Sequence, residues 1–294
     1  MLAALRRDGV RVTTVVLHDK RDAARLRELR APLVLVDTIA ASLAAPYLAR
    51  LRARGSEVVA LCHMRLGALV LARRADRVIA VSRALADELV RGGIRRRRIL
   101  VISPGRGSIA ARPRAMRGQR LLCVGNWTPA KGIHTLVAAV AQLPDVSLDL
   151  VGDTPDAAYA ARVRRAIATR GLARRVRVYG SLDATALARR YAAASIFALP
   201  STREAYGIVY AEALAHGLPI VGCAIPAVRE VTGGAAILVP PGRVAPLAAA
   251  LKKLVTNERS RRALARRSFV RAHQLPTWAE TEARFVRALT VHTN

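Results

Sequence analysis

The sequence of 294 residues is short of acidic and of aromatic side chains. It has 49 Lys and Arg against 20 Asp and Glu, a formal net charge of +29, and only 4% Phe, Trp and Tyr. With so few rings, the aromatic stacking that binds single-stranded nucleic acid is not expected. The apolar share of 52% comes mainly from Ala, Val, Leu and Ile. This composition is typical of a globular protein with aliphatic cores.

Cysteine and long apolar segments are scarce as well. Cys62, Cys123 and Cys223 lie singly within or beside apolar runs, and no CxxC pair occurs. This pattern predicts buried free thiols in a reducing compartment. No stretch approaches the roughly 18 uninterrupted apolar residues of a transmembrane helix, and the first residues carry no signal-type apolar core. These observations predict a cytoplasmic protein.

The excess of positive charge matters because clustered Lys and Arg bind phosphate backbones and anionic lipids. The basic residues are spread along the chain, with tight runs only at Arg95–Arg98 and between Arg112 and Arg120. Such a distribution is typical of a solvated surface, and charge bears on solubility and association more than on fold. Specific nucleic-acid binding is therefore not expected. Peripheral contact with an anionic membrane, at its inner face, and an acidic substrate stay open.

Short apolar runs rich in β-branched residues alternate with Ala- and Arg-rich segments of helical period. Continuous apolar strands between amphipathic helices are typical of parallel sheets covered on both faces, and the pattern occurs twice. The sequence therefore predicts an α/β fold with two Rossmann-like, doubly wound domains. Helices are expected at residues 40–54, 133–143, 159–170 and 185–194. Strands are expected at residues 10–17, 33–37, 58–62, 78–81, 99–102, 121–125, 148–152, 176–180, 196–200, 219–223 and 236–239.

Residues 103–120 separate the two runs of this pattern and are rich in Gly, Pro and Arg without apolar periodicity, which indicates a linker. The expected division is an N-terminal domain at 1–108, a linker at 109–119, a second domain at 120–275 and a closing helix at 276–294. Ligands of doubly wound sheets bind beyond the carboxyl ends of the strands. A site is therefore expected in loops that follow strands, in a cleft that the two domains face.

Two of the few carboxylates, Glu204 and Glu212, stand close together in STREAYGIVYAEALAHGLPIV, residues 201–221. A helix is expected to begin near Gly207, and another follows the loop that carries Lys131. Two helix N-termini with free N–H groups and a cation suit a diphosphate, whereas carboxylates accept hydrogen bonds from vicinal hydroxyls. The arrangement suggests a ligand with sugar on both sides of a diphosphate. The plain alternatives are a helix-capping Glu204, an exposed Glu212 and a solvated Lys131.

Five motifs of this half resemble family-4 retaining glycosyltransferases, the glycosyl transferases group 1, in order and spacing. They are VGNWTPAKG (124–132), LDLVGD (148–153), VRVYG (176–180), IFALPSTREAYGIVYAEALAHGLPIV (196–221) and AAILVPPG (235–242). The similarity covers nearly all of residues 120–290. It implies the GT-B architecture and transfer of a hexose from a nucleotide diphosphate sugar to a hydroxyl acceptor, a glycan, lipid or small molecule, with retention at the anomeric carbon.

The resemblance also implies roles for residues of this sequence. Glu204, the first acid of an E-x7-E motif, stands where the family binds hydroxyls of the transferred sugar, and Glu212 where it binds the ribose. Lys131 corresponds to the lysine that neutralises the leaving phosphate, and His63 to a histidine beside the transferred sugar. The other donor-binding positions implied are Gly125, Asn126, Gly180, Ser181, Tyr206, Gly207 and Ile208.

No cluster of His, Asp or Cys has the spacing of a metal site. A lysine and helix termini can neutralise a departing diphosphate in place of a metal ion. The sequence therefore predicts metal-independent transfer, with the nucleotide sugar as substrate and no cofactor. The motifs specify neither the sugar, the base nor the acceptor.

Two features depart from the family pattern. Asn126 stands where the family usually has an arginine beside the lysine, with Arg203 and Arg106 as possible substitutes. The chain opens like the helix and strand that follow the family's first strand, so the N-terminal domain is expected to lack that strand, most simply through a truncated start. A non-catalytic nucleotide-sugar-binding or partner subunit with a degraded acceptor domain is the rival hypothesis. A basic nucleic-acid or membrane-surface protein, suggested by charge alone, is the third.

Overall fold

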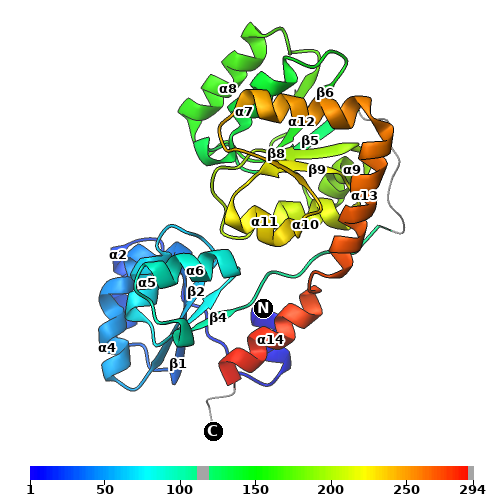
Figure 1. Ribbon diagram of the computed structural model, residues 1–294. Coiled ribbons are helices and arrows are strands. Elements are labelled where there is room, and N and C mark those ends of the chain that lie inside the picture. Colours follow the sequence, from blue (N-terminus) through cyan, green and yellow to red (C-terminus); the bar gives the residue numbers. More distant parts are fainter. Residues whose placement is uncertain (111–118, 291–294) are drawn as a thin grey trace. The chain divides into compact units, whose positions relative to one another are not determined.

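The computed structural model of the chain describes residues 1–110 and 119–290 (Figure 1). Most of the expected linker at 109–119 lies outside the described residues. The chain divides into two compact units, one formed by Met1–Gly105 with Pro276–Asn294 and the other by Arg106–Leu275. We call them the N-terminal unit and the C-terminal unit.

The N-terminal unit is built on a parallel sheet. Its strands are β1 (Leu33–Asp37), β2 (Glu57–Cys62), β3 (Arg77–Ala80) and β4 (Ile99–Val101). They pair in the order β1-β2-β3-β4, all in parallel, so the chain adds each described strand beside the one before it. The helical segments of this unit are α1 (Leu2–Arg7), α2 (Lys20–Ala24), η1 (Arg25–Arg27), η2 (Thr38–Ala40), α3 (Ala41–Ala44), η3 (Ala45–Tyr47), α4 (Leu48–Ala53), α5 (Ala68–Arg74), α6 (Arg83–Arg91), η4 (Arg96–Arg98) and α14 (Trp278–Thr290).

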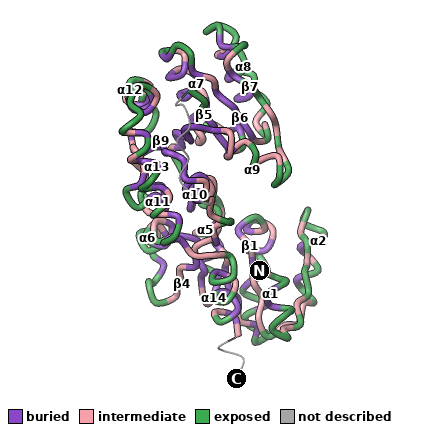
Figure 2. Tube along the Cα trace, turned by 90° about the vertical axis from the view of Figure 1, so that its right-hand side faces the viewer, coloured by how far each residue is buried: buried purple, intermediate pink, exposed green. Residues whose placement is uncertain are grey.

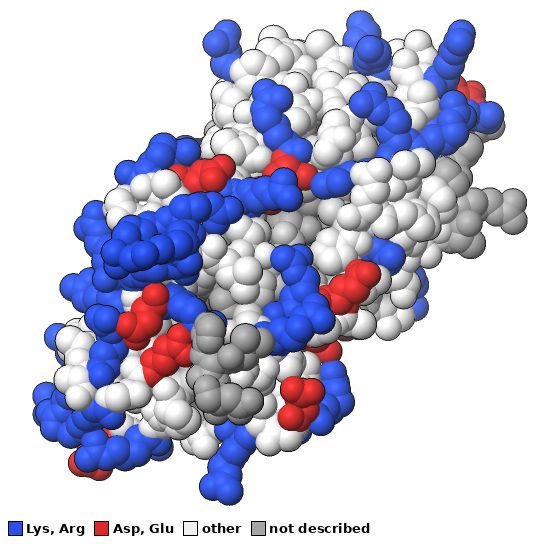
Figure 3. Space-filling view, turned by 60° about the horizontal axis from the view of Figure 1, so that its bottom comes forward, with Lys and Arg blue, Asp and Glu red and all other residues white. Residues whose placement is uncertain are grey.

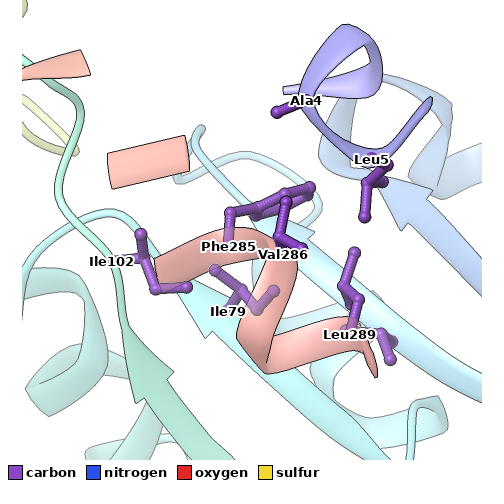
Figure 4. Packing of buried hydrophobic residues seen from close by; sticks show 8 residues of the cluster. Ala4, Leu5, Ile79, Ile102, Phe285, Val286 and Leu289 are labelled. Atoms are coloured by element: carbon purple, nitrogen blue, oxygen red, sulfur yellow. The ribbon is translucent and has the colours of Figure 1, made fainter. Parts of the chain in front are cut away.

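Helices from both ends of the chain, α1 and α14, share the apolar core on one face of this sheet (Figure 4). Successive side chains of a strand point to opposite faces, so Val59 of β2 and Ile79 of β3 reach the same side. There they pack with Leu5 of α1 and with Phe285 of α14, which is completely buried. The closing helix thus supplies part of the core of the N-terminal unit.

Two expectations for this unit are wrong. Residues 10–17 form no strand; Val10 and Val12 instead pack beside the shared core. β-Branched content measures how well a segment fits a half-buried surface and does not ensure that it finds a pairing partner. The single helix expected at 40–54 is broken into short pieces around Pro46, because proline lacks the N–H that a continuous helix needs.

The C-terminal unit contains a six-stranded parallel sheet of order β10-β9-β8-β5-β6-β7. Its strands are β5 (Arg120–Val124), β6 (Ser147–Val151), β7 (Val176–Val178), β8 (Ile196–Leu199), β9 (Ile220–Cys223) and β10 (Ile237–Val239). After β5 the chain adds β6 and β7 on one side of it. It then returns to the other side of β5 and adds β8, β9 and β10 in turn. Strands β5 and β8 are therefore neighbours at the point where the winding reverses.

Helices cover both faces of this sheet (Figure 1). Helices α7, α8 and α12 lie on one side and α10 and α11 on the other. All four residues of β8 and of β9 are buried, as a strand covered on both faces requires, and the burial view shows the strands as the inner layer (Figure 2). The helical segments are η5 (Pro129–Lys131), α7 (Ile133–Val140), α8 (Ala157–Thr169), α9 (Ala184–Ala193), α10 (Ile208–Ala215), α11 (Pro226–Thr232), α12 (Val244–Thr256) and α13 (Glu258–His273).

The predicted fold class, α/β with two parallel-sheet domains, is confirmed. The three cysteines are free and buried, also as predicted. Burial raises the pKa of the Cys62 and Cys123 thiols to about 12 and that of Cys223 to about 11. Thiols with such a high pKa stay protonated at neutral pH, and the thiolate is the reactive form. These cysteines therefore act as small apolar core residues.

On the face shown in Figure 3, Lys and Arg side chains outnumber Asp and Glu and are spread over it rather than gathered in one patch. Across residues 1–110 and 119–290, the structure contains no helix with the length and apolar character needed to cross a membrane.

Candidate functional site

The loops that follow β5 and β8 meet at the point where the winding reverses. The backbone N–H of Thr202, after β8, donates to the carbonyl oxygen of Ala130, after β5, over 2.8 Å. Such a reversal point is where open α/β sheets bind ligands. These two loops carry Lys131 and Glu204, which are 73 residues apart in the chain.

The turn at Gly132 explains how closely the two loops approach. Gly132 has a φ of +66°, and a Cβ atom placed on it would lie 2.4 Å from the carbonyl oxygen of Pro200. A side chain at this position would therefore meet both backbone strain and a backbone atom that cannot move aside cheaply.

Gly132→Ala is expected to lower the free energy of unfolding by about 1 to 3 kcal/mol more than Gly171→Ala, because overpacking adds to the left-handed strain. Gly171 is a matched control, since its φ is also +66° but no atom lies within 4 Å of the added Cβ. The measurement is the urea unfolding midpoint of each variant. An equal loss at both positions would contradict the close approach of the loops.

A lysine, a glutamate and a serine form a hydrogen-bonded group at this place. Lys131 Nζ and Ser201 Oγ both donate to Glu204 Oε1, each over 2.7 Å. The Glu204 side chain is only 9% exposed and that of Lys131 23%. The aliphatic stem of Lys131 lies over Gly125, where an added Cβ would be 3.5 Å from Lys131 Cδ. An ion pair thus sits at the carboxyl ends of the two central strands.

Helix α10 begins beside this group. Its N-cap is Gly207, with φ +94° and no capping side chain. Apart from Tyr210, whose N–H donates to the Gly207 carbonyl over 3.0 Å, the N–H groups of its first turn lack an intrahelical acceptor. The donors recorded at Glu204 in the described part of the chain are Lys131 and Ser201, and none is an N–H of this helix. The Tyr210 ring packs under Gly207, and its hydroxyl donates to the Leu199 carbonyl at the end of β8 over 2.5 Å. Tyr210 therefore anchors the helix end to the sheet.

The first turn of α7 is different. The backbone N–H of His134 donates to the hydroxyl oxygen of Tyr159 over 3.2 Å, and the His134 ring Nδ1 lies 2.9 Å from the same oxygen. Burial, and then the nearby Arg162, lower the pKa of His134. The expectation of two helix ends with free N–H groups is therefore corrected at α7, whose first turn is already partly satisfied.

Glu212 is the fifth residue of α10 and is half-buried rather than exposed on a helix surface. The Tyr191 hydroxyl on α9 donates to its Oε2 over 2.8 Å. Tyr191 is 1% exposed, and the His216 ring stacks on it with centroids 4.8 Å apart. Burial raises the pKa of Glu212, and the hydrogen bond from Tyr191 opposes this rise.

The carboxyl ends of β5, β6 and β7 are brought together by glycines. The Gly152 N–H donates to the Gly180 carbonyl over 2.8 Å, and a Cβ on Gly152 would lie 2.3 Å from the Gly125 carbonyl oxygen. Asn126 Oδ1 accepts from the Asp153 N–H over 3.3 Å. Ser181, next to Gly180, is exposed. This edge of the sheet is therefore lined by backbone rather than by large side chains.

Several predicted residues gather at the site and others do not. Tyr206 is buried and Ile208 exposed, on either side of Gly207. No hydrogen bond or ion pair joins Arg203 or Arg106 to Lys131 or Glu204 within the described residues.

His63 belongs to the N-terminal unit, whereas the residues described above belong to the C-terminal unit. It follows β2, and its Nε2 lies 2.7 Å from Asp37 Oδ1 at the end of the neighbouring strand β1. Asp37 Oδ1 also accepts from the Ile39 N–H over 2.7 Å, which fixes the carboxylate that orients the ring.

Sequence reasoning missed two hydroxyl groups, those of Ser201 and Tyr191. Ser201 stands within the quoted motif, three residues before Glu204, so its spacing carried a usable signal. Tyr191 lies on another helix, 21 residues before Glu212, and only the packing of α9 reveals it.

In the part of the chain that the structure describes, no three His, Cys, Asp or Glu side chains gather as a metal ligand set. A surface pocket of about 430 Å³ on α13 is lined by Arg266, Arg267 and Arg271 among others, and it includes none of the predicted site residues. The candidate site is therefore defined by the hydrogen-bonded group of Lys131, Ser201 and Glu204 at the loops after β5 and β8.

Two family models match the chain. "Glycosyl transferases group 1" covers residues 118–257 and "Glycosyltransferase Family 4" covers residues 16–106. Together they span well over half of the sequence. The chain belongs to the family-4 glycosyltransferases, the glycosyl transferases group 1, and has the GT-B fold.

Curated relatives include a D-inositol 3-phosphate glycosyltransferase of Xylanimonas cellulosilytica, 33% identical over 176 residues, which are 53% of this chain and 42% of the relative. An MMP alpha-(1->4)-mannosyltransferase of Mycolicibacterium hassiacum is 29% identical over 226 residues, 74% of this chain and 54% of the relative. The chain spans about half the length of these two relatives.

Solved structures with the same fold include HepE of Anabaena in complex with UDP and glucose. It has a TM-score of 0.78 and 22% identity, and the match covers 92% of this chain and 80% of HepE. Sucrose-phosphate synthase of Thermosynechococcus elongatus has a TM-score of 0.75 and 24% identity, with 87% of this chain and 72% of that enzyme covered.

Proposed function

We propose that the protein transfers a hexose from a nucleotide diphosphate sugar to a hydroxyl acceptor, with retention at the anomeric carbon and without a metal ion. The observation that carries this proposal is the Lys131–Glu204 ion pair at the reversal point of the C-terminal sheet, beside the uncapped first turn of α10. A cation and free N–H groups can bind a diphosphate, and a carboxylate can accept hydrogen bonds from the sugar hydroxyls. Family membership and the UDP and glucose bound by HepE support the same donor class.

The reaction breaks the bond between the anomeric carbon and the diphosphate oxygen, so negative charge grows on the leaving group. In the proposal, the Lys131 ammonium and the N–H groups of Gly207 and Ile208 stabilise that charge, which fixed donors do without reorganisation. Glu204 binds hydroxyls of the hexose, and Glu212 binds the ribose hydroxyls.

The remaining assignments follow the same scheme. The backbone at Gly125, Asn126 and Tyr206 borders the diphosphate, while Gly180 and Ser181 lie by the base. His63, oriented by Asp37, contacts the transferred sugar. The net charge of +29 supports peripheral contact with an anionic membrane face in the cytoplasm as part of this proposal.

The experiment is a thermal-shift screen of the full chain against UDP-, GDP- and ADP-sugars, because a ligand of the folded state raises the unfolding temperature. Transfer by the donor so identified is then followed by nucleotide release in EDTA, over a panel of glycan and lipid acceptors. The product anomer is read by NMR.

We expect one donor class to stabilise the chain and to yield a product of retained configuration in EDTA. Stabilisation without transfer to any acceptor would favour the non-catalytic binding subunit. Failure to bind any nucleotide sugar, with steeply salt-dependent binding to DNA or anionic vesicles, would overturn the proposal in favour of a basic surface-binding protein.

Tyr191→Phe is expected to weaken UDP binding about tenfold at neutral pH, because Glu212 loses the hydroxyl that holds it. Burial already raises the pKa of Glu212, and the Tyr191 hydrogen bond lowers it. Without that bond the pKa rises further. As pH falls, the carboxylate is then protonated, and ribose binding lost, at a higher pH than in the wild type.

The measurement is the Kd for UDP as the pH is lowered from neutral, compared between wild type and Tyr191→Phe. Tyr47→Phe is the control, since it removes a tyrosine hydroxyl from the N-terminal unit. If UDP affinity is lost at the same pH in wild type and in Tyr191→Phe as the solution is acidified, the role of Tyr191 is refuted.

A further inference from the structure

We propose that Ser201 is a positioning residue for the transferred sugar. Its hydroxyl holds the Glu204 carboxylate in one orientation, so that a single oxygen, Oε2, is presented to a hydroxyl of the hexose. This inference rests on the proposed function, in which Glu204 binds that hexose.

Ser201 is built into the sheet edge. It comes two residues after the end of β8 and is 0% exposed. The next residue, Thr202, is tied to the loop after β5 by its N–H bond to Ala130. The serine backbone is therefore fixed on both sides, and its hydroxyl reaches Glu204 Oε1 from a constant position over 2.7 Å.

The two oxygens of Glu204 are used unequally. Oε1 accepts from both Ser201 Oγ and Lys131 Nζ. Among the described residues no donor is recorded at Oε2. Two donors occupy the two lone pairs of Oε1, so Oε2 is the oxygen left for a ligand. The Glu204 side chain is only 9% exposed, so a ligand can reach Oε2 from few directions.

Ser201 gains importance when the donor binds. In the proposed function the Lys131 ammonium turns to the diphosphate, and the serine hydroxyl is then the bond that keeps the nearly buried carboxylate in place. The second acid has the same arrangement, because the almost fully buried Tyr191 hydroxyl holds Oε2 of Glu212. Each acid of the pair is thus aimed by one buried hydroxyl.

The effect of Ser201 is expected on sugar recognition and not on nucleotide recognition. Ser201→Ala should reduce the affinity for UDP-glucose about tenfold, the usual size for a hydrogen bond to a charged group, and leave the affinity for UDP unchanged. The ratio of the two dissociation constants, Kd(UDP) over Kd(UDP-glucose), isolates the contribution of the hexose.

The experiment is titration calorimetry of the full chain with UDP and with UDP-glucose, for wild type, Ser201→Ala, Ser201→Thr, Glu204→Gln and the Ser201→Ala/Glu204→Gln double variant. The threonine variant keeps a hydroxyl and should restore most of the wild-type ratio. In the Glu204→Gln background, Ser201→Ala should change nothing further, because residues in one network are not additive. Ser268→Ala is the control, since its hydroxyl is equally buried in the same unit but donates to Ala235.

A Ser201→Ala variant that loses UDP and UDP-glucose affinity in equal proportion would overturn the inference, as would an additive effect in the Glu204→Gln background. Either result would leave the proposed function standing. If the wild type binds neither ligand, the set is repeated with the nucleotide and sugar that stabilise it in the thermal-shift screen. A wild type that binds no nucleotide sugar overturns the proposed function itself.

Discussion

Lys131→Ala is expected to lower kcat for hexose transfer by about 10² to 10³, the usual cost of removing one group that stabilises transition-state charge. Lys131 is the cation of the ion pair at the reversal point of the sheet, and its partner Glu204 lies against Gly207, the N-cap of α10. Its charge matters most as the diphosphate departs, so kcat should fall more than the affinity for the donor. The measurement is kcat at saturating donor, together with the Kd for the nucleotide.

Lys252→Ala is the matched control, because it removes an exposed lysine from α12 in the same unit. Glu204 loses its ion-pair partner in the Lys131 variant, so folding is checked by circular dichroism before rates are compared. A kcat within a factor of about three of the wild type would contradict the assigned role of Lys131, since that is far below the cost of losing such a group.

Glu212→Ala is expected to weaken UDP binding by about 10² to 10⁴-fold. Hydrogen bonds from ribose hydroxyls to an ionised carboxylate contribute about 1.5 to 3 kcal/mol each, and they are lost together. The carboxylate is half-buried and burial raises its pKa, while the hydrogen bond from Tyr191 opposes this rise.

Glu258→Ala is the control for this variant, since Glu258 is an exposed acid of α13 that forms an ion pair with Arg262. The Kd for UDP, measured by calorimetry at neutral pH, checks the prediction. Equal affinity in wild type and Glu212→Ala would refute the ribose assignment and leave Glu212 as a structural partner of Tyr191.

The strands of the C-terminal unit could be predicted from sequence because parallel strands buried on both faces are continuous apolar runs. Strands β8 and β9 are of this kind and begin and end within a residue of the prediction. Residues 10–17 show the limit of the same reasoning. They have the residue types of a strand but lie against the core without a pairing partner, and pairing depends on segments far away in the chain.

The candidate site could be predicted only in part for a similar reason. Motifs local to the chain pointed to Glu204, Glu212 and Lys131. The contact of Lys131 with Glu204 depends on the order of strands in the sheet, which local periodicity does not specify. Nor does it reveal that Tyr159 satisfies the first turn of α7, since that hydroxyl comes from the following helix.

The shared packing of α1 and α14 has a consequence for how the protein is made. A chain leaves the ribosome from its N-terminus, and units fold as they are completed. All of the C-terminal unit is synthesised before α14, yet α14 supplies Phe285 to the core that covers Val59 and Ile79. The unit that is translated first therefore cannot complete its native packing until the last helix has been synthesised, and until then Val59 and Ile79 lack part of their apolar cover.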